Sequence, residues 1–224
     1  MRKILAVAVG LVLATGLFST ARAAVGVTAK VGTLGLGGDV TVSLFEPLNI
    51  RAGGNILRYE WDGESNASGG DTADKIKLKL NMENFPVLLD LHPFSGSGFR
   101  ISGGAVFNNN EVTLSAVPGR TVEINDREYS ITSLDGKIDF SKVAPYVGIG
   151  YGNAADRSSN WHFACEFGVM FMGTPEVTLH ATASDPGLQP QLDADVEEQK
   201  KKYEDDVNIL RIYPVISVGV SYTF

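Results

Sequence analysis

The sequence has few of the residues from which catalytic and metal sites are usually built. Its 224 residues include one cysteine, Cys165, and three histidines. A single cysteine cannot form a disulfide within the chain, so we interpret Cys165 as a small apolar side chain. His92 is expected in a turn, His162 near the start of a strand and His180 in a long insertion, too far apart to share one nucleophile or metal ion. We therefore expect no catalytic site, no metal site and no cofactor.

Long apolar runs are also missing, except at the beginning of the chain. Two basic residues there precede an apolar stretch from Ile4 to Phe18, and Ala21-Arg22-Ala23 has the small-x-small pattern of a signal-peptidase site. The stretch is shorter than the roughly 20 residues that a transmembrane helix needs, although such a helix is the competing interpretation. We interpret residues 1–23 as a signal peptide and residues 24–224 as a mature chain that leaves the cytoplasm.

Basic residues are outnumbered by acidic ones. The chain has 19 Lys and Arg against 26 Asp and Glu, and the predicted signal peptide carries three of the basic residues, so cleavage changes the formal net charge from −7 to −10. An acidic chain binds the phosphate backbone poorly, so we expect no nucleic-acid partner. Since no second apolar run of about 18 residues follows, the mature chain could cross a membrane only as a closed β-barrel, in which every backbone polar group is paired.

The end of the chain, from Pro214 to Phe224, alternates strictly between two kinds of residue. Even-numbered positions are Pro, Ile, Val, Val, Tyr and Phe, whereas odd-numbered positions from Ser217 onward are Ser, Gly, Ser and Thr. Period two is typical of a β-strand with one apolar and one polar face. A final strand that ends on Phe resembles the closing strand of bacterial outer-membrane barrels. That resemblance implies contact of Phe224 with the barrel-assembly machinery and of the apolar face with outer-membrane lipid; a half-buried strand of a soluble sandwich is the alternative.

Eight segments alternate in this way, which predicts an all-β fold, an eight-stranded antiparallel up-and-down transmembrane β-barrel. The segments are Val25–Val31, Asp39–Phe45, Leu48–Tyr59, Lys75–Leu91, Phe99–Phe107, Val143–Gly152, Trp161–Gly173 and Pro214–Phe224. Within the fourth segment the apolar residues change from even to odd positions, for which we expect a β-bulge at Glu83-Asn84. A small additional hairpin is expected around Asn125-Asp126.

The connections between the segments alternate in length. Those at 46–47, 92–98 and 153–160 are short, and those at 61–73, 108–142 and 174–208 are long. If the first strand starts in the periplasm, every long connection except the tight turn at 32–38 falls on the outer side, an asymmetry typical of outer-membrane barrels. In the last long connection we expect a surface helix within 193–206, whose charged face is either solvated or a partner site.

Four stretches rich in glycine and aromatic residues resemble one known family. They are VGTLGLGG at 31–38, VAPYVGIG at 143–150, EFGVMFMGTPEV at 166–177, and YPV at 213–215 with Gly219. In order and spacing they are similar to the small outer-membrane barrels exemplified by the carbapenem-susceptibility porins (CarO-like). The resemblance covers most of the mature chain and implies an eight-stranded barrel in a Gram-negative outer membrane. It also implies passage of small basic amino acids or similar solutes, and it carries no catalytic motif.

Charged residues at inward-facing positions of the predicted strands are the most function-like feature. The candidates for lining the lumen are Arg51, Lys77, Asp90, Arg100, Glu166 and Arg211. Either these charges form ion pairs that fill a narrow interior, or they form a constriction that selects solutes.

The sequence thus predicts an integral outer-membrane barrel that acts as a narrow channel or uptake protein for small solutes. The alternative is a structural or surface-interaction barrel that acts through its long outer loops, and a third possibility is lipid hydrolysis or transfer. Whether the lumen is open or filled separates the first possibility from the second.

Overall fold

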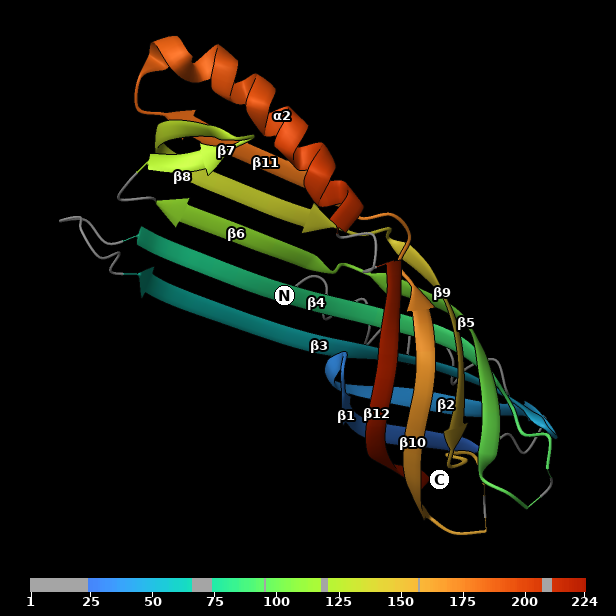
Figure 1. Cartoon of the computed structure of the whole chain (residues 1–224). Coiled ribbons are helices and arrows are strands. Elements are labelled where there is room, and N and C mark those ends of the chain that lie inside the picture. The colour runs from blue at the N-terminus through green and yellow to red at the C-terminus, as the bar shows by residue number, and fades with distance from the viewer. Residues whose placement is uncertain (1–23, 66–73, 95, 118–120, 157, 207–210) are drawn as a thin grey trace, which may run out of the picture.

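A computed structural model of the chain describes residues 24–65, 74–94, 96–117, 121–156, 158–206 and 211–224; the predicted signal peptide lies outside them. Eight antiparallel strands form a closed barrel, and a sheet with one helix continues beyond one of its ends (Figure 1). The barrel strands are β1 (Val25–Gly32), β2 (Gly35–Phe45), β3 (Leu48–Ser65), β4 (Asp74–Leu91), β5 (Phe99–Asn108), β9 (Val143–Tyr151), β10 (Trp161–Phe171) and β12 (Ile212–Thr223). These are the eight strands that the alternation predicts.

The last strand closes the barrel against the first. β12 pairs with β1 from Gly26–Thr223 to Gly32–Ser217, and on its other side with β10. Ile216, Val218 and Val220 face outward and Ser221 is buried, as the alternation predicts. Closure leaves no free strand edge in this part of the molecule, which is the condition for placing strands in lipid.

The two longest strands leave the barrel together. The pairing of β3 with β4 keeps one register from Leu48–Leu91 to Ser65–Asp74, so both strands run on beyond the barrel wall. We call the end of the barrel from which they emerge the extension end, and the opposite end, with the connections at 46–47, 92–98 and 152–160, the turn end.

The predicted long outer loops fold into a sheet on this projecting hairpin. The sheet has the order β3-β4-β6-β8-β11, in which β6 is Glu111–Val117, β8 is Arg127–Asp139 and β11 is Glu176–Ala183. β7 (Thr121–Ile124) pairs with β8 as the expected hairpin, whose turn residues Asn125 and Asp126 have positive φ. We call residues 57–65, 74–81, 111–117, 121–139 and 176–206 the extension.

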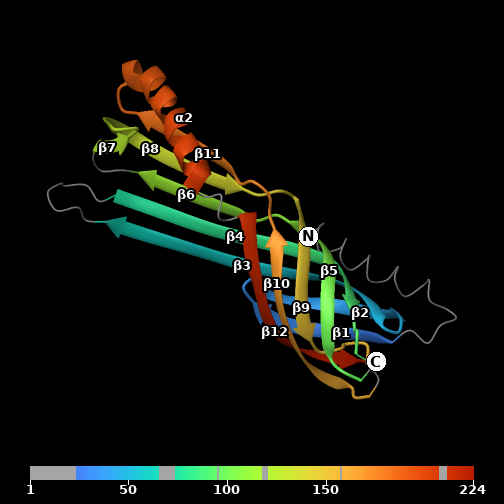
Figure 2. The same cartoon turned by 45° about the vertical axis from the view of Figure 1, so that its right-hand side comes forward.

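One helix covers part of the extension sheet. After a single 3₁₀ turn (η1, Pro186–Leu188), α2 (Gln189–Asp206) packs on β11 and β7, where the surface helix was expected (Figure 2). Leu192 and Val196 are buried against Tyr129, Ile131 and Ala181. In the described part of the chain, no helix is both long and apolar enough to span a membrane.

The expected β-bulge in β4 is wrong. β4 keeps its register with β3, and its even-numbered residues face the interior throughout. In the barrel the outer face is apolar, with Val87 and Leu89 exposed, whereas toward the extension the inner face is apolar, with Leu80 and Met82 in the core. The apolar residues change parity because the surroundings of the strand change: along the barrel its outer face is the apolar one, and toward the extension end its inner face packs in an apolar core.

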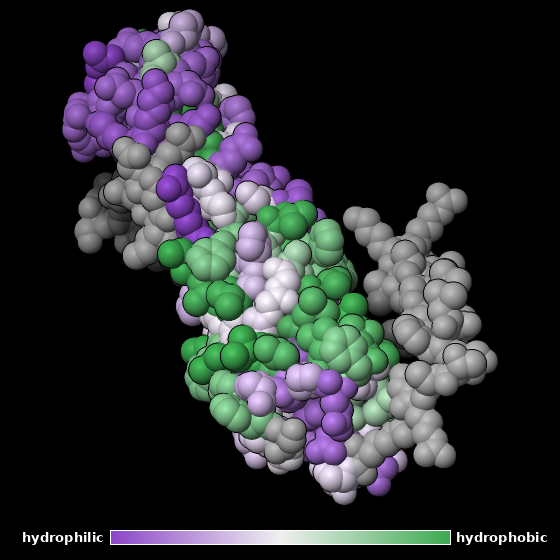
Figure 3. Space-filling model, turned by 90° about the vertical axis from the view of Figure 1, so that its right-hand side faces the viewer, coloured by the Kyte–Doolittle hydropathy of each residue, from purple (hydrophilic) through white to green (hydrophobic). Residues whose placement is uncertain are grey.

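The outer face of the barrel is an exposed apolar surface. On the face shown in Figure 3, hydrophobic residues gather over the barrel, between hydrophilic residues of the extension and of the turn end. Exposed apolar side chains of this surface include Val27, Val31, Val87, Leu89, Ile101, Val147, Ile149, Phe163, Phe167, Ile216, Val218 and Val220. At the turn end Trp161, Tyr222 and Phe224 pack edge to face. Such a surface is stable only against another apolar phase.

Candidate functional site

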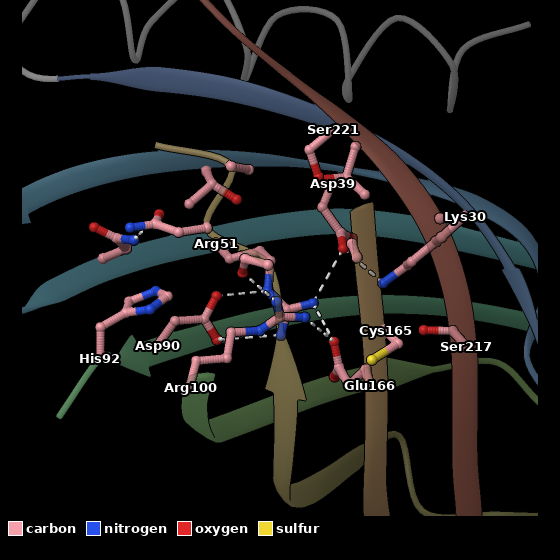
Figure 4. A pocket seen from close by; sticks show the side chains of 18 residues that line it. Lys30, Asp39, Arg51, Asp90, His92, Arg100, Cys165, Glu166, Ser217 and Ser221 are labelled. Carbon is pink, nitrogen blue, oxygen red and sulfur yellow. Dashed lines mark hydrogen bonds and ion pairs between the residues drawn. The ribbon is translucent and has the colours of Figure 1, made fainter. Parts of the chain in front are cut away.

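Arg51 lies at the centre of a cluster of charged side chains inside the barrel (Figure 4). Its Nε and Nη2 donate to the two carboxylate oxygens of Asp90, at 2.8 and 3.1 Å. Its Nη1 donates to Glu166 Oε2 at 2.6 Å and to Asp39 Oδ2 at 3.1 Å. The planar guanidinium of β3 thus joins carboxylates of β2, β4 and β10, an arrangement that its five fixed donors allow and a lysine could not reproduce.

Two further cations complete the cluster. Arg100 of β5 donates to Glu166 Oε2 at 3.1 Å and to the Gly152 carbonyl at 2.6 Å. Lys30 of β1 lies 2.7 Å from Asp39 Oδ2. We call these six side chains the lumen charge network: Lys30, Asp39, Arg51, Asp90, Arg100 and Glu166. Three positive and three negative groups cancel formally, which is how a narrow interior accommodates buried charge.

Neutral side chains also donate to two of the carboxylates, Asp90 and Glu166. Ser102 Oγ donates to Asp90 Oδ1 at 2.6 Å, and the Tyr146 hydroxyl donates to Glu166. A Cβ at Gly148 or Gly168 would collide with the Tyr146 hydroxyl, so the two glycines provide the space in which that ring lies. Tyr146 is at an inward position of β9, and strand parity alone could have identified it, but the sequence analysis did not.

The free space beside the network is small. A cavity lined by Arg51, Asp90, His92 and their neighbours has a volume of about 20 Å³ available to the centre of a water-sized sphere. That is room for about one water molecule. On its wall Asp39 Oδ1, Thr41 Oγ1 and His92 Nδ1 have no hydrogen-bond partner in the described protein, so the cavity suits an ordered water.

Apolar side chains fill the interior between the network and the extension end. Met170 and Ala144 are completely buried there. We call the cluster the apolar plug: Leu34, Met82, Leu88, Val106, Phe140, Ala144, Tyr146, Met170, Met172 and Val215. The interior is therefore filled at two successive levels, first by paired charges and then by packed hydrocarbon.

The six predicted lumen residues do not all meet. Arg51, Asp90, Arg100 and Glu166 belong to the lumen charge network. Lys77 lies in the extension with its side chain 61% exposed, because without the expected bulge the odd-numbered residues of β4 face outward. Arg211 is exposed just before β12 begins, outside the part of the strand that lines the barrel.

The three histidines occupy separate parts of the molecule. His92 is buried in the lumen, His162 Nε2 bonds to carbonyls of the turn at Asp156 and Ser159, and His180 is exposed on β11. Within the residues that the structure describes, no group of three or more His, Cys, Asp or Glu is placed to hold a metal ion.

A second polar cluster joins α2 to the hairpin of β7 and β8. The buried Asp195 carboxylate accepts from the Tyr129 hydroxyl, from Arg127 Nη1 at 3.1 Å and from Asn125 Nδ2 at 3.2 Å. The hydrogen bond from the Tyr129 hydroxyl is the main cause that lowers the pKa of Asp195, and the bonds from Asn125 and Arg127 add to it. The Tyr129–Asp195 bond also raises the pKa of Tyr129. The helix is thus held by apolar packing and by a specific acceptor, which makes the extension a folded unit and not a set of loops.

No family model and no curated protein sequence matches the chain, but solved structures do. CarO of Acinetobacter baumannii is 22% identical, with 89% of this chain and 97% of that chain covered and a TM-score of 0.56. CarO2 of Acinetobacter baumannii is 22% identical, with coverages of 90% and 98% and a TM-score of 0.58. A major outer membrane protein from Thermus thermophilus is 15% identical, with coverages of 91% and 100% and a TM-score of 0.41. The expected CarO-like fold, a small outer-membrane-type β-barrel, is confirmed.

Proposed function

We propose that this protein is an integral outer-membrane barrel that acts at the cell surface through its extension, with the barrel as its membrane anchor. The observation that carries the proposal is the contrast between the two parts. The interior of the barrel is filled by the lumen charge network and the apolar plug, whereas the inserted regions outside it form an ordered sheet and helix with their own core.

The outer face of the barrel supports the membrane location. A closed barrel satisfies its backbone polar groups internally, and its exposed apolar surface is stable when it contacts lipid. In this setting Trp161 and Tyr222 would lie at the periplasmic interface, where aromatic side chains are common. We place the contact with the barrel-assembly machinery at the exposed Phe224, directly beside them.

The filled interior makes a permanently open channel unfavourable. A solute path would require Arg51 to leave its carboxylates, and an uncompensated buried charge costs about 3–5 kcal/mol. The apolar plug would also have to move. The second candidate remains a narrow channel or uptake protein for small solutes, favoured by the presence of charged side chains of both signs in the lumen. We propose no catalytic role for either candidate.

The positions where the extension leaves the barrel allow a direct test. The Asn108 amide bonds to the Lys142 carbonyl at 2.9 Å, and the Met172 amide bonds to the Arg211 carbonyl at 2.7 Å, so each inserted region starts and ends at neighbouring points. Short Gly-Asn turns can therefore replace 109–141 and 173–210, and a third can replace 58–81, because Leu57 and Met82 stand opposite each other in the β3–β4 ladder. We expect the shortened protein to fold as a heat-modifiable barrel in the outer membrane.

Two measurements then separate the candidates. Cells with the shortened barrel should lose surface capture of partner proteins in cross-linking and should differ from wild type in envelope integrity, while refolded full-length protein should give no conductance steps in planar bilayers. Reproducible steps for salts or basic amino acids, together with unchanged surface properties after the deletion, would refute the proposal in favour of the channel.

A further inference from the structure

Among the residues that the structure describes, none pairs with one edge of β3 in the extension. The last residue of β3 that pairs with β2 is Ile56, opposite Leu36, whereas β3 itself continues to Ser65. From residue 57 onward β3 pairs only with β4, and none of the backbone hydrogen bonds found elsewhere in the described chain involves these residues. In Figures 1 and 2, β3 accordingly forms the border of the extension sheet. Alternate backbone N–H and C=O groups along it are available to another strand.

The side chains on one face of this edge are apolar. Tyr59 and Trp61 are 53% and 47% exposed, and the Trp61 indole lies over Gly63. Across the ladder they stand opposite Leu80 and Leu78 of β4, so the edge is continuous with an apolar sheet face. A strand added here would find a hydrophobic surface for every second side chain.

The side chains on the other face give the edge a net negative charge. Glu60 and Asp62 alternate with the aromatics, and each pairs across the ladder with a lysine of β4, Lys79 at 3.4 Å and Lys77 at 3.8 Å. The lysines therefore lie one strand away from the edge, and these two carboxylates lie at the edge. Arg58 precedes them on the same face and is paired with Glu83 of β4 at 2.8 Å. The pairs of Glu60 and Asp62 are exposed, so they are worth little, and these carboxylates can engage a second cation.

We propose that the unpaired edge of β3 binds, by β-strand addition, an extended segment of a partner protein in which basic and apolar residues alternate. Its basic side chains lie beside Glu60 and Asp62, its apolar side chains lie beside Tyr59 and Trp61, and its backbone continues the ladder. This inference rests on the proposed surface function and names the chemistry of the partner. A second copy of the chain fits less well, because the registers that pair most of the edge put Glu60 opposite another acidic residue.

The test uses the mature protein in detergent and synthetic peptides of about nine residues, the length of the unpaired edge. One peptide alternates lysine and valine, a second alternates glutamate and valine, and a third has the composition of the first in blocks. We expect the alternating lysine peptide to bind at least roughly tenfold more tightly than the other two. Two versions of that peptide, N-methylated at odd or at even residues, should differ, since only one of them can still donate to the edge.

A charge-swapped variant provides the matched control. In E60K/D62K/K77E/K79E each ion pair across the β3–β4 ladder is kept but its direction is reversed, so the edge becomes basic. We expect peptide preference to invert, with heat-modifiable folding and α2 content unchanged. Light scattering should find that the protein is a monomer both with and without the lysine peptide.

Three results would overturn the inference: equal binding of the blocked and alternating peptides, equal binding of the two N-methylated peptides, or a preference for lysine that survives the charge swap. A dimer that the lysine peptide cannot dissociate would also overturn it, in favour of a second copy. In each case an effect of removing the extension on surface properties would still support the proposed function, so the two failures are distinguishable.

Discussion

Arg51 and Glu166 join opposite walls of the barrel. Their side chains meet at 2.6 Å, and their strands, β3 and β10, are separated by β2, β1 and β12 on one side and by β4, β5 and β9 on the other. The ion pair thus spans the interior of the barrel from one wall to the other. Such a contact holds together parts of the wall that no ladder connects directly.

Removal of Arg51 should therefore destabilise the whole barrel. In Arg51→Ala three carboxylates would share two cations, and an uncompensated buried charge costs about 3–5 kcal/mol. Arg51→Lys should recover part of this, since it restores the charge without the two-pronged geometry. Urea unfolding in lipid vesicles measures the loss. Lys77→Ala, which removes an exposed charge, should change the stability by less than about 0.5 kcal/mol, and an equal effect of both alanine variants would contradict this role of the ion pair.

The stability of the barrel should also be sensitive to substitution of Gly168. A methyl group at Gly168 collides with the Tyr146 ring and would push its hydroxyl away from Glu166. Overpacking of this kind costs about 1–3 kcal/mol. Gly103→Ala on β5, which is separated from β10 by β9, is the matched control, because a Cβ there would lie 3.9 Å from the nearest atom, the Tyr146 carbonyl oxygen. Similar unfolding curves for the two variants would rule out this role of Gly168.

The extension should unfold separately from the barrel. Leu192 is completely buried between α2 and the sheet, and Leu192→Ala should cost about 2–5 kcal/mol of local stability. Hydrogen exchange should then accelerate in α2, β7 and β8, while the heat-modifiable migration of the barrel stays the same. Loss of that migration would mean that the two cores form one cooperative unit.

The attachment of α2 should depend on pH at both extremes. The pKa of Asp195 lies below its ordinary value of 3.8, so its contribution is present above about pH 4 and is lost as the pH falls through the folded-state pKa. The pKa of Tyr129 lies above its ordinary value of 10.0, so that contribution is lost as the pH rises beyond about 10.

Hydrogen exchange of α2 against pH measures both limits. In Asp195→Asn the acid limit should disappear, because the carboxylate that titrates is gone, and the alkaline limit should move to lower pH, because the bond that raises the pKa of Tyr129 loses its charged acceptor. An acid limit that persists in this variant would assign it to another group.

The barrel could be predicted because its strands have one environment on each side. Alternation placed Arg51, Asp90, Arg100 and Glu166 on the inner face, and the eight strands have the expected order. Alternation says nothing about height along the barrel, however, so it could not show which of these charges meet. Lys77 was misplaced for a related reason. Its apparent inward position depended on a bulge that was inferred on the assumption that the outside of β4 is apolar everywhere.

The extension was predicted as long loops because its strands lack a lipid-facing side. β6 and β11 do alternate polar and apolar residues, but they are short and lie inside long polar insertions, so they were not counted as strands. In β8 the alternation changes parity between Ile131 and Leu134. Two local signals were sufficient to predict elements of the extension. Asn125-Asp126 marked the hairpin of β7 and β8, and the apolar spacing of Leu192 and Val196 marked α2.

Because β3 and β4 keep one register from the barrel into the extension, the outer part of the molecule is a continuation of the barrel wall and not a separate domain on a linker. At about 3.4 Å per residue, strands of 18 residues are about 60 Å long, roughly twice the thickness of the hydrocarbon core of a bilayer. The same two strands form the barrel part and the extension part of this hairpin, with no loop between the two parts. The tilt of β3 and β4 in the barrel therefore sets the direction in which the extension sheet points. A lateral force on the extension would be transmitted along β3 to Arg51.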